Sequence, residues 1–324
     1  MRIDLHTHAK LSKATDFSPA YYEEMIAEAA ANGLDAIALT EHFNTRNFFE
    51  VYEQLDRLYP YNGEYYETGR VNIFPGMEVD IRENGHILLI GRKEHVLEVR
   101  QALEGYTSKD AFIPFDELLN IAERCPLLKI GAHPYREATP LHHLTREQLS
   151  RLDAFDLNAK DMFEYGGEVN RANVERFAAE LGKPVTAGSD THQCLQYGSV
   201  YNELDHPCYT AADLKQAILQ GAYTVHVADS LPLQVKASVM LKKVLKRLAL
   251  LEPAGASDTV SGPVPGTVSG TVSGVVSGTV SGAVSGAVSG AVSGAVSGAV
   301  SGAVPGAAAG GGLGAVLEAA PGAS

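Results

Sequence analysis

Residues 2–8 read RIDLHTH, a short run in which polar and apolar residues alternate before it ends in two histidines, His6 and His8. In an extended strand, residues i and i+2 point to the same face. If residues 2–7 form a strand, both imidazoles emerge together at its C-terminal end, where α/β folds keep their active sites. The pair by itself fits a surface strand equally well, so the rest of the chain has to decide between a structural and a metal-binding role.

Short apolar runs alternate with helical patterns up to about residue 230. Further strands are predicted over residues 35–42, 72–81, 86–91, 128–133, 154–159, 184–190 and 222–227, with a hairpin turn at 82–85. Helices are predicted over residues 18–33, 45–58, 115–125, 145–152, 168–182 and 210–221. This alternation indicates an α/β fold with a mainly parallel sheet and right-handed crossovers. The number of units favours a closed barrel over an open sheet.

Composition limits the classes of partner. The formal net charge of −13 opposes a broad nucleic-acid surface, which needs a basic face, but it is compatible with a local cationic pocket. The three cysteines, Cys125, Cys194 and Cys208, form no C-x-x-C pair, which indicates reduced thiols. The sequence shows neither a signal-peptide pattern nor an apolar run of membrane-spanning length. We therefore expect a cytoplasmic protein without a membrane partner; the oligomeric state stays open.

The sequence changes character after about residue 252. The domain predicted over residues 1–252 ends in an amphipathic basic helix over residues 235–252. We expect its apolar side to pack on the barrel with its lysines in water, a membrane-surface helix being the alternative; that side comprises Val235, Val239, Leu241, Val244, Leu245 and Leu248. Residues 253–324 carry a four-residue repeat rich in Val, Ser, Gly and Ala, which opposes a dense core. We expect a disordered tail without a catalytic role.

Nearly every predicted strand ends in an imidazole or a carboxylate. These residues are His6, His8, Glu41, His42, Glu78, His86, His133, Asp190 and His192, and they include six of the chain's 11 histidines. Such groups bind Zn, Mn or Fe. A single histidine at a strand end is most often structural. So many at one end of one sheet predict a metal cluster at the rim of the barrel.

These residues lie in an ordered set of motifs: DLHTH (4–8), LTEH (39–42), GMEV (76–79), HILLIG (86–91), GAHP (131–134) and GSDTH (188–192). Over roughly residues 1–230, the set resembles the PHP (polymerase and histidinol phosphatase) family. The resemblance implies a distorted (β/α)7 barrel of the TIM-like type. It also implies hydrolysis of phosphate esters with two or three divalent ions, of Mn, Zn or Fe.

The resemblance also implies roles for individual positions. His6, His8, Glu78 and Asp190 would hold one metal, Glu78 would bridge to a second held by His86 and His133, and His42 with His192 would hold a third. Catalytic roles would fall to Glu78, Asp190 and His192. A hydroxide shared by two metals would attack phosphorus, and the leaving oxygen would take its proton from His192, His42 or water.

One position departs from the family pattern. Five residues after the H-x-H pair, many relatives carry a carboxylate or an imidazole, whereas this chain has Lys13. Either Asp16 completes the third metal site, or Lys13 supplies part of the missing charge and binds the substrate phosphate; an exposed loop lysine is the plain alternative. Arg136 is the first candidate for binding phosphate oxygens, and Arg46 and Lys160 are weaker ones.

Four functions are compatible with such a site. The leading hypothesis is a phosphoesterase acting on a small phosphorylated molecule such as a sugar, nucleotide or histidinol phosphate. The alternatives are a nuclease that trims short oligonucleotides, a metal-dependent amide or ester hydrolase, and a non-catalytic module stabilised by metal. The fold does not fix the substrate.

Overall fold

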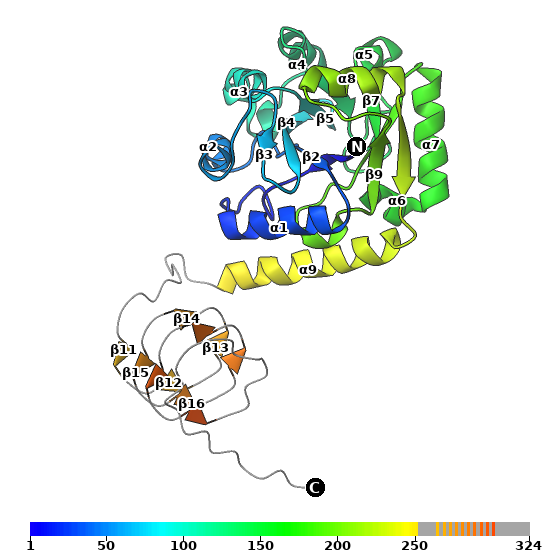
Figure 1. Cartoon of the computed structure of the whole chain (residues 1–324). Coiled ribbons are helices and arrows are strands. Elements are labelled where there is room, and N and C mark those ends of the chain that lie inside the picture. The colour runs from blue at the N-terminus through cyan, green and yellow to red at the C-terminus, as the bar shows by residue number, and fades with distance from the viewer. Residues whose placement is uncertain are drawn as a thin grey trace. The chain divides into compact units, whose positions relative to one another are not determined.

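The computed structural model describes residues 1–251 and ten two-residue strands between residues 264 and 301. The chain divides into two units, Met1–Leu250 and Leu251–Ser324. The first unit is a barrel-shaped sheet wrapped by helices, and it holds all the candidate ligands (Figure 1).

The sheet of the first unit has ten strands in the order β10-β9-β1-β2-β4-β5-β6-β7-β8, with β3 added to β4. The strands are β1 (Arg2–Thr7), β2 (Ala36–Leu39), β3 (Tyr66–Glu67), β4 (Asn72–Ile81), β5 (Gly85–Ile90), β6 (Leu128–Gly131), β7 (Ala154–Asn158), β8 (Val185–Gly188), β9 (Val200–Leu204) and β10 (Tyr223–Val227). The helices are α1 (Pro19–Ala31), α2 (Phe48–Leu58), α3 (Lys93–Ala102), α4 (Phe115–Ala122), α5 (Arg146–Ser150), α6 (Ala159–Tyr165), α7 (Gly167–Glu180), α8 (Ala211–Gln220) and α9 (Leu231–Leu251).

The predicted α/β class and the distorted barrel are confirmed. Pairing is parallel over β1–β2–β4 and over β6–β7–β8. It is antiparallel over β4–β5–β6, and also where β9 and β10 join the other edge of β1. The tight turn after β4, in which Asn84 has a φ of 69°, reverses the chain and breaks the parallel run. The sheet is therefore less parallel than the sequence pattern predicts.

The barrel closes between β8 and β1 through a side chain rather than a continuous ladder. The Asn202 carboxamide accepts from the N–H of Ala187 at 2.8 Å and donates to the carbonyls of Ala187 and Ile3 at 2.8 and 3.1 Å. Farther along, the N–H of Asp190 donates to the carbonyl of His6 at 2.8 Å. These bonds place the C-terminal ends of β1 and β8, and the ligands they carry, next to each other.

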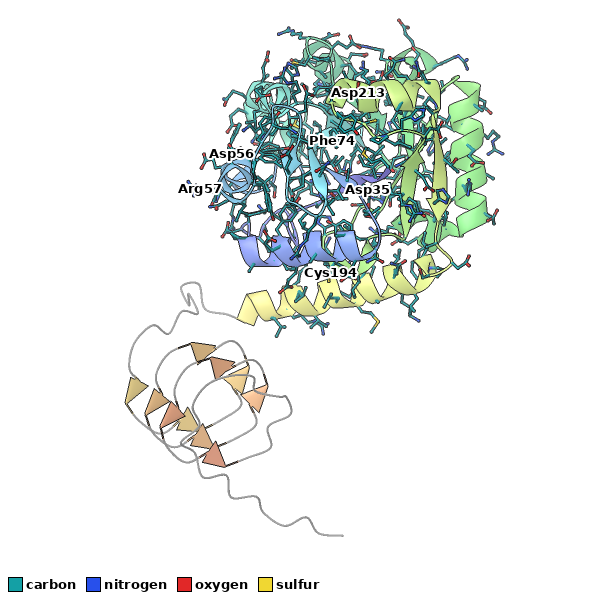
Figure 2. The ribbon with its side chains drawn as sticks, viewed as in Figure 1. Asp35, Asp56, Arg57, Phe74, Cys194 and Asp213 are labelled. Atoms are coloured by element: carbon teal, nitrogen blue, oxygen red, sulfur yellow. The ribbon has the colours of Figure 1, made fainter. Side chains whose placement is uncertain are left out.

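The sheet separates two hydrophobic layers. Because side chains alternate along a strand, Phe74 and Glu78 lie on the same face of β4. Phe74 is completely buried in the smaller layer inside the barrel, whereas Asp56 and Arg57 lie on the outer side of α2 (Figure 2). The larger layer, which includes Met25 of α1, packs between the sheet and the helices. Glu78 therefore stands at the end of a dry barrel interior.

The last helix of the first unit, α9, differs from its prediction. Its first turns are anchored, with Val235 and Ser238 buried, but Val244 and Leu248 are about half exposed, at 51% and 52%. The expectation that the whole apolar side packs on the barrel with the lysines in water is wrong for the second half of the helix. Here Lys242 lines a cavity above the candidate ligands. The reason is that the rim beside this half of α9 is lined by polar residues, whereas the apolar core reaches only the first turns of the helix.

The described residues of the second unit are strands within the repeat. Val264 pairs in parallel with Val280, and Val280 with Val296. Most of residues 253–324 lie outside the described residues, so the expected disordered tail stays a prediction. Among the residues that the structure describes, no helix has both the length and the apolar character needed to cross a bilayer.

Candidate metal centre

Two candidate ligands have unusual backbone conformations. His133, just after β6, has a φ of 32°, and Asp190, just after β8, has a φ of 56°. Positive φ is uncommon for residues other than glycine, and it persists where surrounding contacts enforce it. At Asp190 one such contact is the backbone hydrogen bond to His6. Both turns occur where a strand ends at the rim, which is where the ligand side chains gather.

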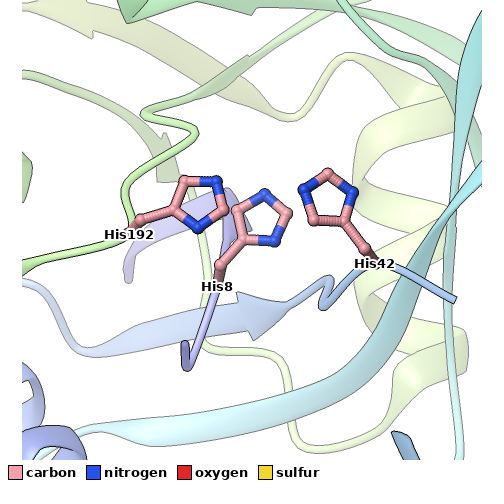
Figure 3. A group of neighbouring side chains, drawn as sticks. All are labelled: His8, His42 and His192. Carbon is pink, nitrogen blue, oxygen red and sulfur yellow. The ribbon is translucent and has the colours of Figure 1, made fainter. Parts of the chain in front are cut away.

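The candidate ligands form three groups, in each of which the ligand atoms lie within 4.8 Å of one another. The groups are His6, His8 and Asp190; Glu78, His86 and His133; and His8, His42 and His192. The structure thus brings together the residues that the sequence assigns to the first two sites, with Glu78 between them. It adds His8 to the third group, where its ring stacks between those of His192 and His42, with centroids 4.1 and 4.5 Å away (Figure 3).

Glu78 lies at the centre of the cluster with imidazoles on both of its carboxylate oxygens. Oε1 lies 2.6 Å from Nδ1 of His86 and 3.3 Å from Nε2 of His133. Oε2 lies 2.8 Å from Nδ1 of His42 and 3.6 Å from Nε2 of His8. This is the arrangement expected of a carboxylate that bridges two metal ions.

Several of these atoms lack hydrogen-bond partners. Within the described part of the chain, Nε2 of His6, Nε2 of His8 and Oε2 of Glu78 are buried and form no hydrogen bond of good geometry, the short distance from Oε2 to His42 included. Leaving a buried polar group unsatisfied costs about 1–3 kcal/mol, so such groups need another partner. Imidazole nitrogens with carboxylate oxygens are a donor set that Zn, Mn and Fe accept. The residues therefore fit bound divalent ions.

The two central carboxylates are ionised. Burial alone would raise the pKa of Glu78, but the neighbouring imidazoles, led by His86 and His42, outweigh it and hold that pKa well below its usual range. Burial likewise opposes ionisation of Asp190, but the Arg136 guanidinium together with His6 and His8 outweighs it, so that this pKa also falls well below its usual range. Both side chains are in the form that binds a cation.

The imidazoles divide into two kinds. Burial lowers the pKa of His42, and it lowers those of His133 and His192 well below the usual value. These three rings are neutral at neutral pH and keep a lone pair for a metal. Burial would lower the pKa of His86 too, but the carboxylates of Glu78 and Asp80 together reverse this and raise it to about 9. Without an ion, a proton at His86 supplies the positive charge that Glu78 attracts.

Comparison with known families decides the identity of this site. A PHP domain model matches residues 4–148, and a PHP-associated model matches residues 170–223. The chain belongs to the PHP family. The two matched stretches contain all eight clustered ligands. Membership of the PHP family, together with the three ligand groups, makes this chain a metal-dependent hydrolase.

Individual relatives are distant. A protein of Syntrophotalea carbinolica named "Probable phosphatase" is 26% identical over 211 residues, covering 63% of this chain and 85% of its own. The crystal structure of PsfC from Pseudomonas syringae has a TM-score of 0.63 at 22% identity and covers 75% of this chain and 98% of its own. A lesion-specific endonuclease, PfuEndoQ from Pyrococcus furiosus, has a TM-score of 0.51 at 19% identity, over 69% of this chain and 58% of its own. At these identities, the two structures show the PHP fold alone.

Further side chains in the PHP domain orient the ligands. Nδ1 of His6 lies 3.0 Å from a buried oxygen of Asp156, which also accepts from Asn158 at 3.1 Å. Nδ1 of His192 donates to the Lys10 carbonyl at 2.9 Å. Such partners fix the tautomer and direct the other ring nitrogen to the metal. Asp156 is not among the predicted site residues; the signal that could have indicated it is an acidic residue in the middle of an apolar strand, AFDLN.

Glu41, a predicted strand-end carboxylate, lies outside the three groups. It is completely buried, and its Oε2 accepts from the N–H groups of Ala9 and Lys10 at 3.1 and 3.2 Å. Its Oε1 accepts from the N–H of His42 at 3.1 Å. Glu41 therefore holds the loop that follows His8 against the end of β2.

Arg136 lies in the wall of the site with its guanidinium already engaged. It donates to Asp161 at 2.8 Å and to Asn158 at 3.0 Å, and it pairs with Asp190 at 2.9 Å. The structure thus makes Arg136 a positioning residue for Asp190. The predicted contact with substrate phosphate stays a prediction.

The loop after β1 separates Lys13 from Asp16. Nζ of Lys13 lies 2.8 Å from Asp80, whose other oxygen lies 3.1 Å from Nε2 of His86. Lys13 therefore acts on the cluster through Asp80. The Asp16 side chain is 63% exposed and faces Arg46 at 3.8 Å, so the structure does not bring Asp16 into any ligand group. The alternative in which Asp16 completes the third site stays a prediction, and in this structure the loop directs its carboxylate to solvent.

Proposed function

We propose that this chain is a phosphoesterase that hydrolyses a small phosphorylated molecule, using two or three divalent ions of Mn, Zn or Fe. The observation that carries the proposal is the position of Glu78, with histidines on each of its two oxygens. Divalent ions bound on both sides would lower the pKa of a water molecule and neutralise charge that develops on the phosphoryl oxygens.

The chain's own residues would prepare this chemistry in three ways. Glu78 and Asp190 supply negative charge that holds the cations at a fixed separation. Asp156 and the Lys10 carbonyl lock the rings of His6 and His192 in one orientation. The barrel interior below Glu78 is apolar, which excludes bulk water and strengthens every electrostatic interaction above it.

His192 is better suited to bind a metal ion than to donate a proton to the leaving oxygen. Its Nδ1 hydrogen bond to the Lys10 carbonyl leaves Nε2 without a proton when the ring is neutral. Burial, together with the charges of His8 and Lys242, holds its pKa well below the usual value, so the neutral ring dominates at neutral pH. We therefore assign the proton for the leaving oxygen to water rather than to His192.

The proposal is tested with the full chain loaded with Mn. Phosphate release from p-nitrophenyl phosphate should require the ions and fall at least about a hundredfold in Glu78→Gln. Asp205→Asn, which changes an exposed carboxylate directly after β9, should retain full activity. Hydrolysis of p-nitrophenyl acetate alone would favour the amide or ester hydrolase. Metal uptake without turnover of any of these substrates would favour a non-catalytic module.

A phosphodiesterase is the second candidate. The observation that favours it is a group of lysines in the wall of the cavity over the site, because adjacent phosphates of an oligonucleotide bind cationic side chains. These lysines are Lys160, Lys242, Lys243 and Lys246. Cleavage of a short single-stranded oligonucleotide at a higher kcat/KM than that for p-nitrophenyl phosphate would favour the phosphodiesterase over the leading proposal.

The free thiols of Cys125, Cys194 and Cys208 are compatible with a reducing compartment, and we propose the cytoplasm as the location of the protein.

A further inference from the structure

A cavity of about 490 Å³ opens over the PHP ligands. One part of its wall consists of His42, Glu78, His86, Asp190 and His192. Another part is basic and comes from two helices: Lys160 from α6, and Lys242, Lys243 and Lys246 from α9. The volume is in the range of pockets that hold whole small molecules. It therefore has room for more than the phosphoryl group at the metals.

The three α9 lysines lack a polar partner among the residues that the structure describes. Within the described part of the chain, none of them forms an ion pair or a side-chain hydrogen bond, unlike Lys13 with Asp80 or Lys93 with Asp56. Across the cavity, Lys160 has only Glu164, at 4.0 Å. The basic wall is thus largely uncompensated.

The helix holds these lysines in place at an electrostatic cost. Lys242 and Lys246 are one turn apart on α9, and like charges at that spacing destabilise a helix by a few tenths of a kcal/mol. Burial, with a contribution from Lys246, lowers the pKa of Lys242 to about 8. Ser238 on the same face is buried and accepts a hydrogen bond from Gln193, the residue after the ligand His192. This bond ties the lysine face of α9 to the metal centre.

We propose that Lys242, Lys243 and Lys246 of α9, together with Lys160, form a second anion subsite for a second phosphate of the substrate. This inference rests on the proposed phosphoesterase function. Divalent ions held by the ligand cluster would neutralise one phosphoryl group, so four further ammonium groups in the same cavity exceed what a monophosphate needs. The substrate class is therefore a small molecule with two phosphate groups, one of which is hydrolysed.

Binding to the Mn-loaded full chain tests this subsite without turnover. The probes are methylphosphonate and a series of linear alkane diphosphonates of increasing length, titrated by calorimetry at constant free Mn. The wild-type protein should bind at least one diphosphonate about tenfold or more tightly than methylphosphonate, because two charge-assisted contacts replace one. The double variant Lys242→Met/Lys246→Met should lose this gain and keep its affinity for methylphosphonate. Lys236→Met, an exposed α9 lysine outside the cavity, is the matched control and should change neither.

The outcomes separate the subsite from the proposed function. A wild-type protein with no diphosphonate gain at any length, or a gain that survives in the double variant, overturns the subsite. Such a protein can still hydrolyse p-nitrophenyl phosphate, which would leave the phosphoesterase proposal intact. A lysine-dependent affinity for a short oligonucleotide without a diphosphonate gain would also contradict the small-molecule class, and it would assign the lysines to a phosphodiester backbone.

Discussion

Arg136 and Asp190 form a buried ion pair inside the metal centre, with Nη2 of the guanidinium 2.9 Å from Oδ2 of the carboxylate. The other oxygen of Asp190, Oδ1, lies 3.2 Å from Nε2 of His8. One carboxylate is thus shared between a permanent cation and the ligand cluster, so its charge and its orientation are fixed before any ion binds.

This pair predicts the effect of replacing Arg136. In Arg136→Ala the pKa of Asp190 should rise, because the main charge that lowers it is gone. Mn affinity should fall about tenfold or more, and the acid limb of the pH profile of kcat/KM should move to higher pH. Calorimetry and the pH profile measure both effects. Arg136→Lys, which keeps the charge, should recover most of the affinity, and an unchanged profile in Arg136→Ala would show that the pair is unimportant.

Much of this site can be predicted from the sequence because its ligands lie at the ends of strands, and the local sequence pattern indicates where strands end. His6 and His8 end a strand, and so do His42, His133 and Asp190, and a parallel barrel brings strand ends together. The supporting residues carry no such signal. Asp156 orients His6, 150 positions away, and Asn202 joins Ile3, 199 positions away, to β8, and no local periodicity reveals such contacts.

Two elements illustrate the same limit for the fold. The patterns do not predict β9, Val200–Leu204, whose side chains alternate between buried and partly exposed. The run is short, and its buried middle residue is the polar Asn202, which reaches across to β8. The helical period of α9 is clear in the sequence, but which face of the helix contacts the barrel depends on whether the barrel surface beside it is polar or apolar. Because the rim there is polar, Lys242 lines the cavity and Val244 is half exposed.

Asn202 should contribute strongly to stability. Asn202→Ala removes three buried hydrogen bonds that close β8 onto β1 and leaves their backbone partners unsatisfied. We expect the free energy of unfolding to fall by about 2–4 kcal/mol, as judged by urea denaturation of the metal-free protein. Gln216→Ala, at an exposed position of α8, is the control and should change it by less than about 1 kcal/mol. A loss at Asn202 no larger than the control's would contradict closure by this side chain.

Gly188 should be indispensable for the geometry of the cluster. A Cβ at this position would overlap the Cβ of His6 and lie 2.8 Å from Oδ1 of Asp156. Gly188→Ala should therefore displace the His6 ring and weaken Mn binding about tenfold or more, measured by calorimetry on protein whose circular dichroism is native. Gly105→Ala, with nothing within 4 Å of the new methyl group, should bind Mn normally. Native affinity in Gly188→Ala would refute the predicted clash.

Mn affinity should increase with pH across the neutral range. The pKa of His86 is raised to about 9, because the attraction of Glu78 and Asp80 outweighs burial, so below that pH a proton competes with the ion. Each displaced proton should strengthen binding by up to about tenfold per pH unit between pH 6.5 and 8.5. Calorimetry in buffers of different ionisation enthalpy counts the released protons. His86→Gln should release fewer protons than the wild type, and equal release would exclude His86 as their source.

Metal stoichiometry tests the bridging role of Glu78 most directly. The full chain is equilibrated with Mn, freed of loose ions by gel filtration and analysed by elemental mass spectrometry, beside Glu78→Gln and the exposed control Asp205→Asn. The wild type and the control should retain two or more ions per chain, and Glu78→Gln should retain fewer, because one side chain serves both ions. A natively folded wild type that retains no ion, or a Glu78→Gln protein with the full complement, would contradict the account.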